Sequence, residues 1–234
     1  MKRLLGLFLS ISLIIGMTFS LTSCDREYNE DEVIAAATDL IERSVSLKIN
    51  DIFFGEGIRY DTLTGFVHGN YKEADSYHLS ELGFENFAEL EYISTTVYTQ
   101  GCYDAIFKNV LKPSYDADGN IAIYARYTEL RDEKTNEFIA FLVNVKYEGK
   151  IIEGVAEYHT STLEIIDVEG EVIRLSVKAT VTSPDGEKTQ NRTVKFSMLE
   201  TQDGWRLDSP IYVGYDENYS RYEDLLEENE NLFN

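Results

Sequence analysis

The chain has few of the residue types that would fix a structure or a chemistry by themselves. Its 234 residues include two Cys, three Pro, three His and one Trp. Two thiols exclude a disulfide scaffold and a Cys-rich zinc module, and three Pro with 15 Gly exclude collagen-like or Pro-rich material. The three His, which are His68, His78 and His159, have none of the spacings typical of zinc-binding pairs.

Positive charge is scarce as well. Lys and Arg number 21 against 42 Asp and Glu, which gives a net charge of −21. Nucleic acid, a polyanion, would be repelled, so we exclude it as a partner. Aromatic side chains are abundant, with 16 Tyr and 12 Phe, and they supply enough apolar surface to exclude a wholly disordered chain.

The beginning of the chain is typical of an export signal. The positive pair Lys2-Arg3 precedes an apolar stretch, residues 4–21, and the motif Leu21-Thr22-Ser23-Cys24 follows before the chain turns polar. This motif resembles the lipobox of bacterial lipoproteins. The resemblance implies that residues 1–23 are a signal peptide, removed just before Cys24, and that the Cys24 thiol is lipidated.

The alternative is a single transmembrane anchor, for which this apolar stretch is of borderline length. Both interpretations place the rest of the chain outside the cytoplasm, at the cell surface or in the periplasm. Without residues 1–23, 19 basic side chains face 42 acidic ones, a net charge of −23. We expect the bilayer, reached through acylated Cys24, to be one partner, while the anionic body stands off anionic lipids. With Cys24 acylated, Cys102 has no disulfide partner and is expected to be buried.

Helical periodicity dominates the first half. A short acidic tether, residues 24–31, contains Asn29, which is typical of a helix start. Residues 80–112 are predicted to be helical in two pieces, the second capped by Thr99, and residues 58–79 are left as short strands or loop. In the first helix, of about 17 residues, the apolar residues that recur on one face are Val33, Ala37, Leu40, Ile41 and Val45.

From about residue 120 the period changes to two. Alternation with polar partners predicts antiparallel sheet with one solvated face, and the preceding helices are available to cover the other face. The sequence therefore predicts an α+β fold in one domain, residues 32–213, with the helices of 32–112 packed on a curved, cone-like antiparallel sheet of 120–213. Residues 214–234 form an acidic, Tyr-rich tail, either a solvated helix or a docking arm for a basic partner.

We expect no catalytic site, no metal site and no cofactor. The segment Asp116-Ala-Asp118-Gly-Asn120 has the first ligand positions of a calcium loop. Ile121 stands where such a loop requires Gly, and Tyr127 stands where it requires a bidentate Glu. The segment is therefore predicted to be a turn.

Two further groups are weak candidates for chemistry. Asp167 falls on the same strand face as the apolar residues before it, where a buried carboxyl would have a raised pKa and act as a base. A strand end entering a turn is the favoured interpretation of that position. His78 and Glu81 are one helical turn apart, and we expect them to form an ordinary surface contact.

The last third of the chain resembles a known fold family. A strand, the Asp185-Gly186 turn, a second strand and then Asp203-Gly204-Trp205-Arg206-Leu207 are similar to the closing hairpin of nuclear-transport-factor-2-like domains. This resemblance implies a cone-shaped α+β fold in which Trp205 packs on the helix layer. The run of residues 87–99, with strands that end near a Gly-Trp, is also loosely similar to the secreted IseA inhibitors of cell-wall DL-endopeptidases, which carry no catalytic residues of their own.

Three functions are compatible with these features. The favoured one is a non-catalytic binding module outside the membrane, whose partner is a basic cell-envelope protein and which would inhibit or regulate a cell-wall hydrolase. The second is a small-molecule binder that uses the cavity of the cone. The third is an isomerase or dehydratase of the same fold, which needs a carboxylate or His and a Tyr donor around one ligand.

Overall fold

A computed structural model of the chain describes residues 28–217. The predicted signal peptide, the lipidation site Cys24 and residues 218–234 of the predicted tail lie outside this range. The tether is shorter than predicted, because the first helix begins at Glu30. Over the described range, no helix is long and apolar enough to cross a membrane.

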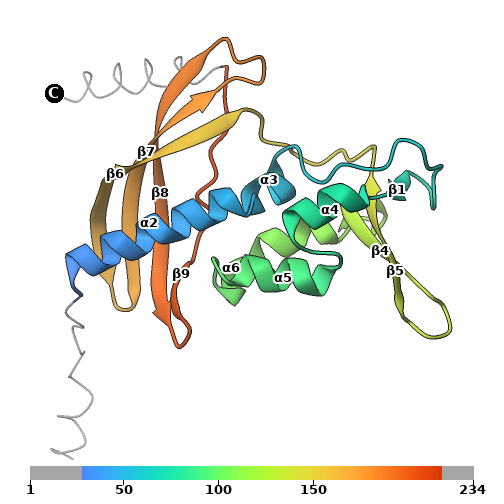
Figure 1. The fold of residues 1–234 in the computed structure, drawn as a ribbon, viewed down its shortest axis with the longest axis horizontal. Coiled ribbons are helices and arrows are strands. Elements are labelled where there is room, and N and C mark those ends of the chain that lie inside the picture. Colours follow the sequence, from blue (N-terminus) through green and yellow to red (C-terminus); the bar gives the residue numbers. More distant parts are fainter. Residues whose placement is uncertain (1–27, 218–234) are drawn as a thin grey trace, which may run out of the picture.

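The fold is α+β, as predicted, with helices first and most strands after them (Figure 1). The helices are α2 (Glu30–Ser46), α3 (Ile49–Phe54), α4 (Ser76–Leu82), α5 (Phe87–Thr95), α6 (Gln100–Ala105) and the 3₁₀ helix η1 (Phe107–Leu111). The strands are β1 (Tyr71–Glu73), β2 (Ser114–Tyr115), β3 (Ile121–Ile123), β4 (Tyr127–Arg131), β5 (Phe138–Asn144), β6 (Val155–Glu169), β7 (Val172–Thr182), β8 (Thr189–Thr201) and β9 (Gly204–Leu207).

The largest sheet is antiparallel and has the strand order β6-β7-β8-β9. Helix α2 lies across one face of it and contacts β6 and β9 (Figure 1). Strand β7 confirms the predicted alternation, because every second residue is buried and the residues between them are exposed or half-buried. The buried residues of β7 are Ile173, Leu175, Val177, Ala179 and Val181.

Helix α2 begins at the predicted cap. The Asn29 side chain accepts a hydrogen bond from the Asp31 backbone N at 3.0 Å, which satisfies one of the amides that a helix start leaves unpaired. The prediction for Val45 is wrong, since its side chain is 50% exposed. In the last turn of α2 the buried residue is Ser44 instead, and its hydroxyl forms a hydrogen bond with that of the buried Tyr98.

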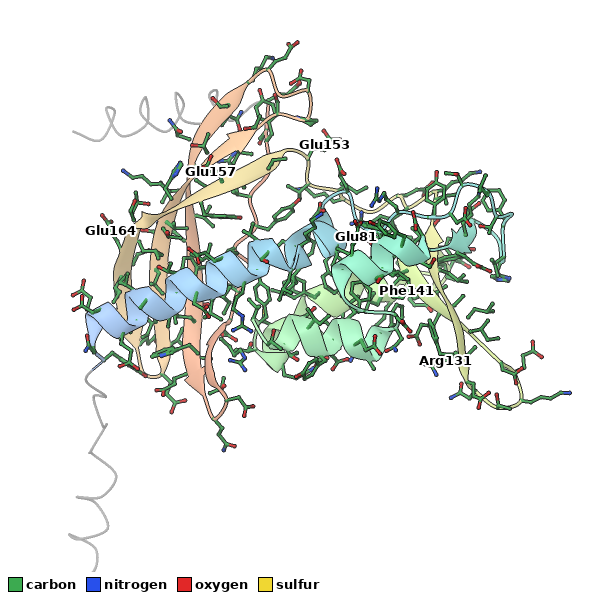
Figure 2. All side chains as sticks on the ribbon, viewed as in Figure 1. Glu81, Arg131, Phe141, Glu153, Glu157 and Glu164 are labelled. Atoms are coloured by element: carbon green, nitrogen blue, oxygen red, sulfur yellow. The ribbon has the colours of Figure 1, made fainter. Side chains whose placement is uncertain are left out.

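The first strands form separate sheets. Strands β1, β5 and β4 make a three-stranded antiparallel sheet in that order, beside α4 and α5 (Figure 1). Phe141 of β5 packs against the rings of Phe84 and Phe87, with centroids 5.9 and 5.1 Å away (Figure 2). The sequence analysis predicted one sheet over residues 120–213. The strand-free segment 145–154 separates β5 from β6 instead.

Residues 80–112 are helical as predicted, but the division into two pieces is wrong, because the range holds the end of α4 and then α5, α6 and η1. The ambiguous stretch 58–79 contains β1 and the start of α4, and the Thr99 side chain caps α6 by accepting from Cys102 N at 3.0 Å. Cys102 is buried in the core, and burial raises the pKa of its thiol to about 12. Trp205 is half-buried against the core, and its ring centroid lies 5.7 Å from that of Tyr28, just before α2.

Candidate binding groove

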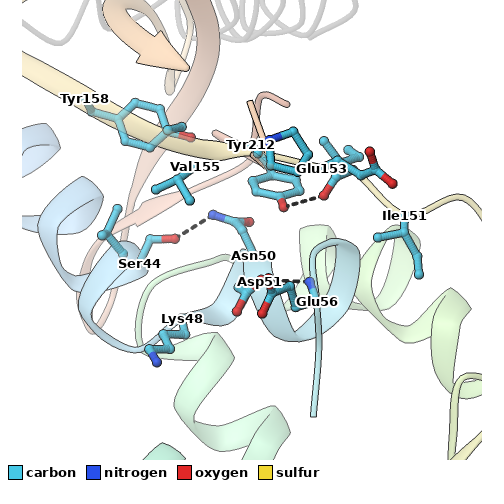
Figure 3. Close-up of a pocket in the computed structure, with 15 residues that line it drawn as sticks. Ser44, Lys48, Asn50, Asp51, Glu56, Ile151, Glu153, Val155, Tyr158 and Tyr212 are labelled. Carbon is cyan, nitrogen blue, oxygen red and sulfur yellow. Dashed lines mark hydrogen bonds between the residues drawn. The ribbon is translucent and has the colours of Figure 1, made fainter. Parts of the chain in front are cut away.

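A pocket of about 510 Å³ lies where the end of α2 and helix α3 face the segment that leads into β6 (Figure 3). The residues from the helical side are Ser44, Val45, Lys48, Asn50, Asp51 and Glu56. The residues from the opposite side are Ile151, Ile152, Glu153, Gly154, Val155, Ala156, Tyr158, Pro184 and Tyr212.

A second pocket, of about 390 Å³, adjoins the first and shares Val45, Ala156 and Tyr158 with it. It is lined by residues of α2 and by the β6 residues Ala156, Glu157, Tyr158 and Thr160. Successive side chains of a strand point to opposite faces of its sheet. A pocket that contacts consecutive residues of β6 therefore touches both faces, which is possible along the edge of the strand. In the described sheet β6 is an edge strand. We call the two pockets together the α2–β6 groove.

The floor of the groove is held by buried polar side chains (Figure 3). Asn50 Nδ2 donates to Ser44 Oγ at 2.8 Å, and the Tyr98 hydroxyl donates to Asn50 Oδ1 at 3.0 Å. The Tyr212 hydroxyl donates to the Ile152 carbonyl oxygen at 3.1 Å, and that of Tyr158 donates to the Ile211 carbonyl. The first two bonds hold α2 and α3 together, and the last two hold the strand side together. The two sides are joined by Ile152 N, which donates to the Phe54 carbonyl of α3 at 2.7 Å, so the groove is preformed.

The charges around the groove are mostly negative. One ammonium group, Lys48, lines it together with the five carboxylates Glu42, Asp51, Glu56, Glu153 and Glu157. Between residues 28 and 217, none of these five forms an ion pair with Lys or Arg. In Figure 2, Glu153 lies on the segment that leads into β6 and Glu157 lies on β6 itself. The groove is therefore an acidic surface on which carboxylates outnumber cations.

Asp51 is the carboxylate that lies deepest. Burial is the main cause that raises its pKa above the ordinary Asp value, and the negative charge of Glu56 raises it further. A hydrogen bond from Glu56 N at 2.9 Å and the charges of Lys48 and Arg126 act in the opposite direction. A carboxyl with a raised pKa in a cleft is typical of a functional site.

The end of α3, behind the groove, is fixed by the buried side chain of Arg126. Its guanidinium donates to the Phe53 carbonyl at 3.0 Å and to the Gly55 carbonyl at 2.6 Å, at the negative end of the helix. A Cβ on Gly57, where φ is +80°, would lie 2.3 Å from Arg126 Nη2. The sequence analysis missed Arg126, because alternation over 121–127 places this position on the solvated face.

The candidates named from the sequence lie away from the groove. Asp167 is exposed and pairs with Arg174 at 2.6 Å, so the hypothesis of a buried base is wrong. The prediction that His78 and Glu81 form an ordinary surface contact is wrong in placing His78 at the surface. His78 is buried and its Nδ1 accepts from Arg59 N at 2.9 Å, while Glu81 pairs with the Arg59 guanidinium at 3.2 Å.

The calcium-like segment is a turn between β2 and β3, as predicted. The Asp116 carboxylate accepts from Asn120 N at 2.8 Å and from Asp118 N at 3.0 Å, so its oxygens close the turn. In the part of the chain that the structure describes, no cluster of three or more His, Cys, Asp or Glu could hold a metal ion.

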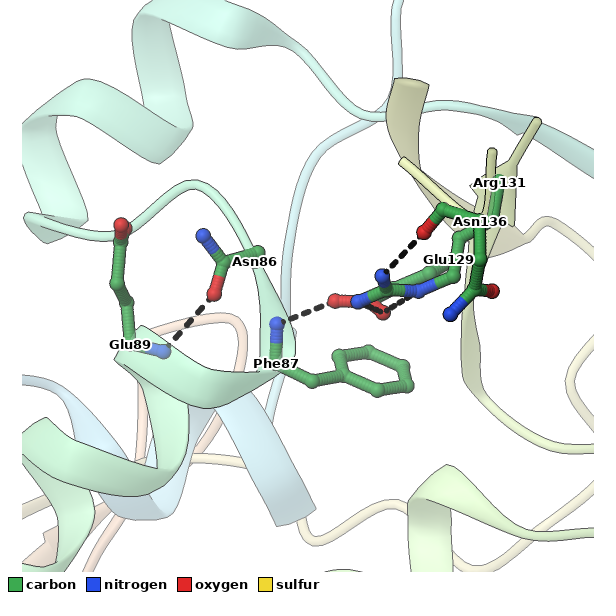
Figure 4. A network of polar contacts seen from close by, with 6 residues as sticks. All are labelled: Asn86, Phe87, Glu89, Glu129, Arg131 and Asn136. Carbon is green, nitrogen blue, oxygen red and sulfur yellow. Dashed lines mark hydrogen bonds and ion pairs between the residues drawn. The ribbon is translucent and has the colours of Figure 1, made fainter. Parts of the chain in front are cut away.

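A second polar cluster, centred on Glu129, is structural (Figure 4). Its carboxylate accepts from the backbone N of Phe87 at 2.7 Å and pairs with Arg131 at 2.6 Å. Arg131 in turn donates to the Asn136 carbonyl at 3.0 Å. The cluster joins the start of α5 to the β4–β5 hairpin and leaves the Glu129 carboxylate no unoccupied side for a ligand.

Neither the family models nor the curated proteins compared with this chain match it. The arrangement of the groove residues, with apolar walls, a satisfied polar floor and acidic rims beside a strand edge, is suited to binding an extended, positively charged ligand.

Proposed function

We propose that the chain is a lipid-anchored, extracytoplasmic and non-catalytic module that binds a basic, extended segment of a cell-envelope protein in the α2–β6 groove. The observation that carries the proposal is the set of five carboxylates that line a groove beside an edge strand, none of them in an ion pair with Lys or Arg among the described residues. The lipobox-like motif ending at Cys24 supports the location. A cell-wall hydrolase such as a DL-endopeptidase is the partner class that the loose resemblance to IseA inhibitors suggests.

The edge of β6 explains why an extended segment is favoured over a helix. An edge strand presents backbone N–H and C=O groups to a neighbour, and an extended peptide satisfies them by adding one strand to the sheet. Alternate side chains of such a peptide would meet Val45 of α2 and Tyr158 of β6, which line the groove. The intervening side chains would lie on the opposite face of the strand, beside Val155 and Glu157, which explains a preference for Lys or Arg at those positions.

Charge would also steer the encounter. The mature chain has a net charge of −23 on this interpretation, so a basic partner is attracted over a distance that shrinks with ionic strength. We therefore expect the association rate to fall steeply with added salt, while the dissociation rate changes little.

A displayed library of random peptides, selected on the protein, tests the proposal. We expect selected peptides to carry Lys or Arg at alternate positions, and the double variant Glu42→Gln and Glu157→Gln to bind them about fivefold more weakly. Glu164→Gln is the matched control, because Glu164 is an exposed carboxylate of β6 that does not line the groove. Peptides without basic residues, or equal loss in the control, would contradict the proposal.

A small amphipathic molecule is the second candidate ligand, because the first pocket alone has the volume of a typical ligand site. A thermal-shift screen with uncharged apolar metabolites distinguishes the two candidates, since stabilisation by such a molecule without any peptide selection favours the small ligand. We do not propose the isomerase or dehydratase function. It needs a Tyr donor that faces the ligand, and the Tyr212 hydroxyl donates to the Ile152 carbonyl instead.

A further inference from the structure

Far from the groove, the loop of residues 60–72 presents apolar side chains to solvent. Leu63 is 94% exposed and Phe66 58%, and Tyr60 and Val67 are each more than a third exposed. Single exposed apolar residues are ordinary on a protein surface, but several on one short loop indicate a contact surface. This group, within the 60–72 loop, is independent of the α2–β6 groove.

The loop is held in this conformation by its own hydrogen bonds. Asp61 N donates to the Glu73 carbonyl at 2.9 Å, and Leu63 N donates to the Asp61 carboxylate at 2.7 Å. On the return side, Val67 N donates to the Tyr71 carbonyl at 2.9 Å. Leu63 therefore projects from a fixed turn and is already ordered for a partner.

The charge pattern of the loop differs from that of the rest of the molecule. Residues 62–71 contain no Asp, Glu, Lys or Arg, although 27% of the chain is charged. Lys72 follows directly, and its Nζ lies 5.5 Å from the ring centroids of both Tyr60 and Phe66. An apolar tip with aromatic rings and a Lys at its base is typical of a segment at a bilayer interface, where the ammonium reaches the headgroups.

The position of the loop agrees with a contact on the membrane that holds the anchor. The loop leads into β1, which lies at the opposite end of the longest axis from the start of α2 (Figure 1). The chain from Cys24 to Asn29 spans at most about 18 Å, so an acylated Cys24 keeps the start of α2 near the lipid. A second contact at the far end would lay the long axis along the membrane.

We propose that the 60–72 loop inserts Leu63 and Phe66 into the interface of the bilayer to which the chain is anchored. The proposal rests on the anchor in the proposed function, but not on the ligand of the groove. The contact is weak by itself and works because the anchor keeps the loop at a high effective concentration near the lipid. The uncharged tip allows this approach even though the body is anionic.

Fluorescence quenching by brominated lipid tests the insertion. The full chain is expressed with its own leader, so that it can be processed and acylated. The product is reconstituted into phosphatidylcholine vesicles with and without brominated acyl chains. A Trp introduced by Phe66→Trp should lose about half its emission in brominated vesicles, because a residue at the interface lies within reach of the acyl chains. The wild type, whose single Trp is Trp205 beside Tyr28 near the anchored end, sets the baseline of quenching. The control Ile166→Trp, which replaces a 50% exposed residue of β6, should add no quenching to that baseline.

A second arm separates the loop from the anchor. The chain with residues 1–24 replaced by a hexahistidine tag is held on vesicles by a nickel-chelating lipid, so attachment no longer depends on Cys24. Quenching of Phe66→Trp in this arm, without attachment of the natural chain, would keep the loop proposal and overturn the anchor. If Phe66→Trp had equal emission in both kinds of vesicle, in both arms, the loop proposal would be overturned. The exposed apolar residues of the 60–72 loop would then be assigned to a contact with a protein.

Discussion

At the scale of single residues, Asp51 links the charge of the groove to the stability of the fold. Its pKa is raised mainly by burial, so the folded protein pays a cost for keeping this carboxyl ionised. That cost is present at neutral pH and disappears once the carboxyl is protonated in both folded and unfolded chains.

We predict that Asp51→Asn unfolds at a higher temperature than wild type at pH 7, because the amide removes the buried charge and its oxygen can still accept from Glu56 N. Below the ordinary Asp pKa of 3.8 the two proteins should unfold at similar temperatures. Thermal denaturation followed by circular dichroism at the two pH values measures the difference. A variant that is less stable at pH 7 would show that the carboxylate stabilises the fold.

His78 has the opposite protonation preference to Asp51: the fold favours its neutral form and is destabilised when the ring is protonated. Burial, and then the charge of Arg59, lower its pKa below the ordinary value of 6.5, and its Nδ1 accepts from Arg59 N. The folded state therefore binds the proton more weakly than the unfolded chain. Stability contributed by the neutral ring is fully present above pH 6.5 and is lost as the pH falls below it.

We predict that His78→Asn flattens the loss of stability between pH 7 and pH 5, because an Asn oxygen can accept the same hydrogen bond and does not titrate. The measurement is urea denaturation at several pH values. His68→Asn, at an exposed His, is the control and should keep the wild-type slope. An unchanged slope in His78→Asn would assign the pH dependence to other groups.

At the scale of elements, helix α3 depends on the cation at its end. Arg126 is 4% exposed and donates two charge-assisted hydrogen bonds to the last carbonyls of that helix. We predict that Arg126→Met costs about 2–4 kcal/mol of unfolding free energy, because two buried carbonyls lose a charged donor. Equilibrium urea unfolding measures it. The control Arg174→Met removes ion pairs whose side chains are 47–72% exposed and should cost less than about 1 kcal/mol.

The same elements show how far the sequence predicts the structure. Strand β7 and helix α2 follow their periodicity, because each buries one face against a single neighbouring layer. The separation of the sheets was not predictable, since alternation marks a strand but does not say which strand pairs with it. Arg126 was missed for a related reason: its burial depends on the carbonyls at the end of α3, which are distant in sequence. The groove depends on the same long-range packing, and no local motif marks it.

At the scale of the whole molecule, the excess of carboxylates destabilises the compact state. Like charges are closer together in the folded chain than in the unfolded one, and salt screens their repulsion. We predict that the unfolding temperature rises as sodium chloride is raised from a few millimolar to physiological strength. Differential scanning calorimetry measures the shift. A falling unfolding temperature would mean that the few favourable ion pairs outweigh the repulsion.

The pairing of β6 with β7 has one further consequence. Its register shifts between His159 and Glu164 and again between Ile165 and Asp167, so the longest stretch that pairs without interruption is the first part of the strand, Val155–His159. Irregularities of this kind bend a strand and spoil it as a template for another molecule. Beyond His159 the border of the sheet is thereby protected against edge-to-edge pairing with a second copy of the molecule, while Val155–His159 keeps a regular edge beside the groove.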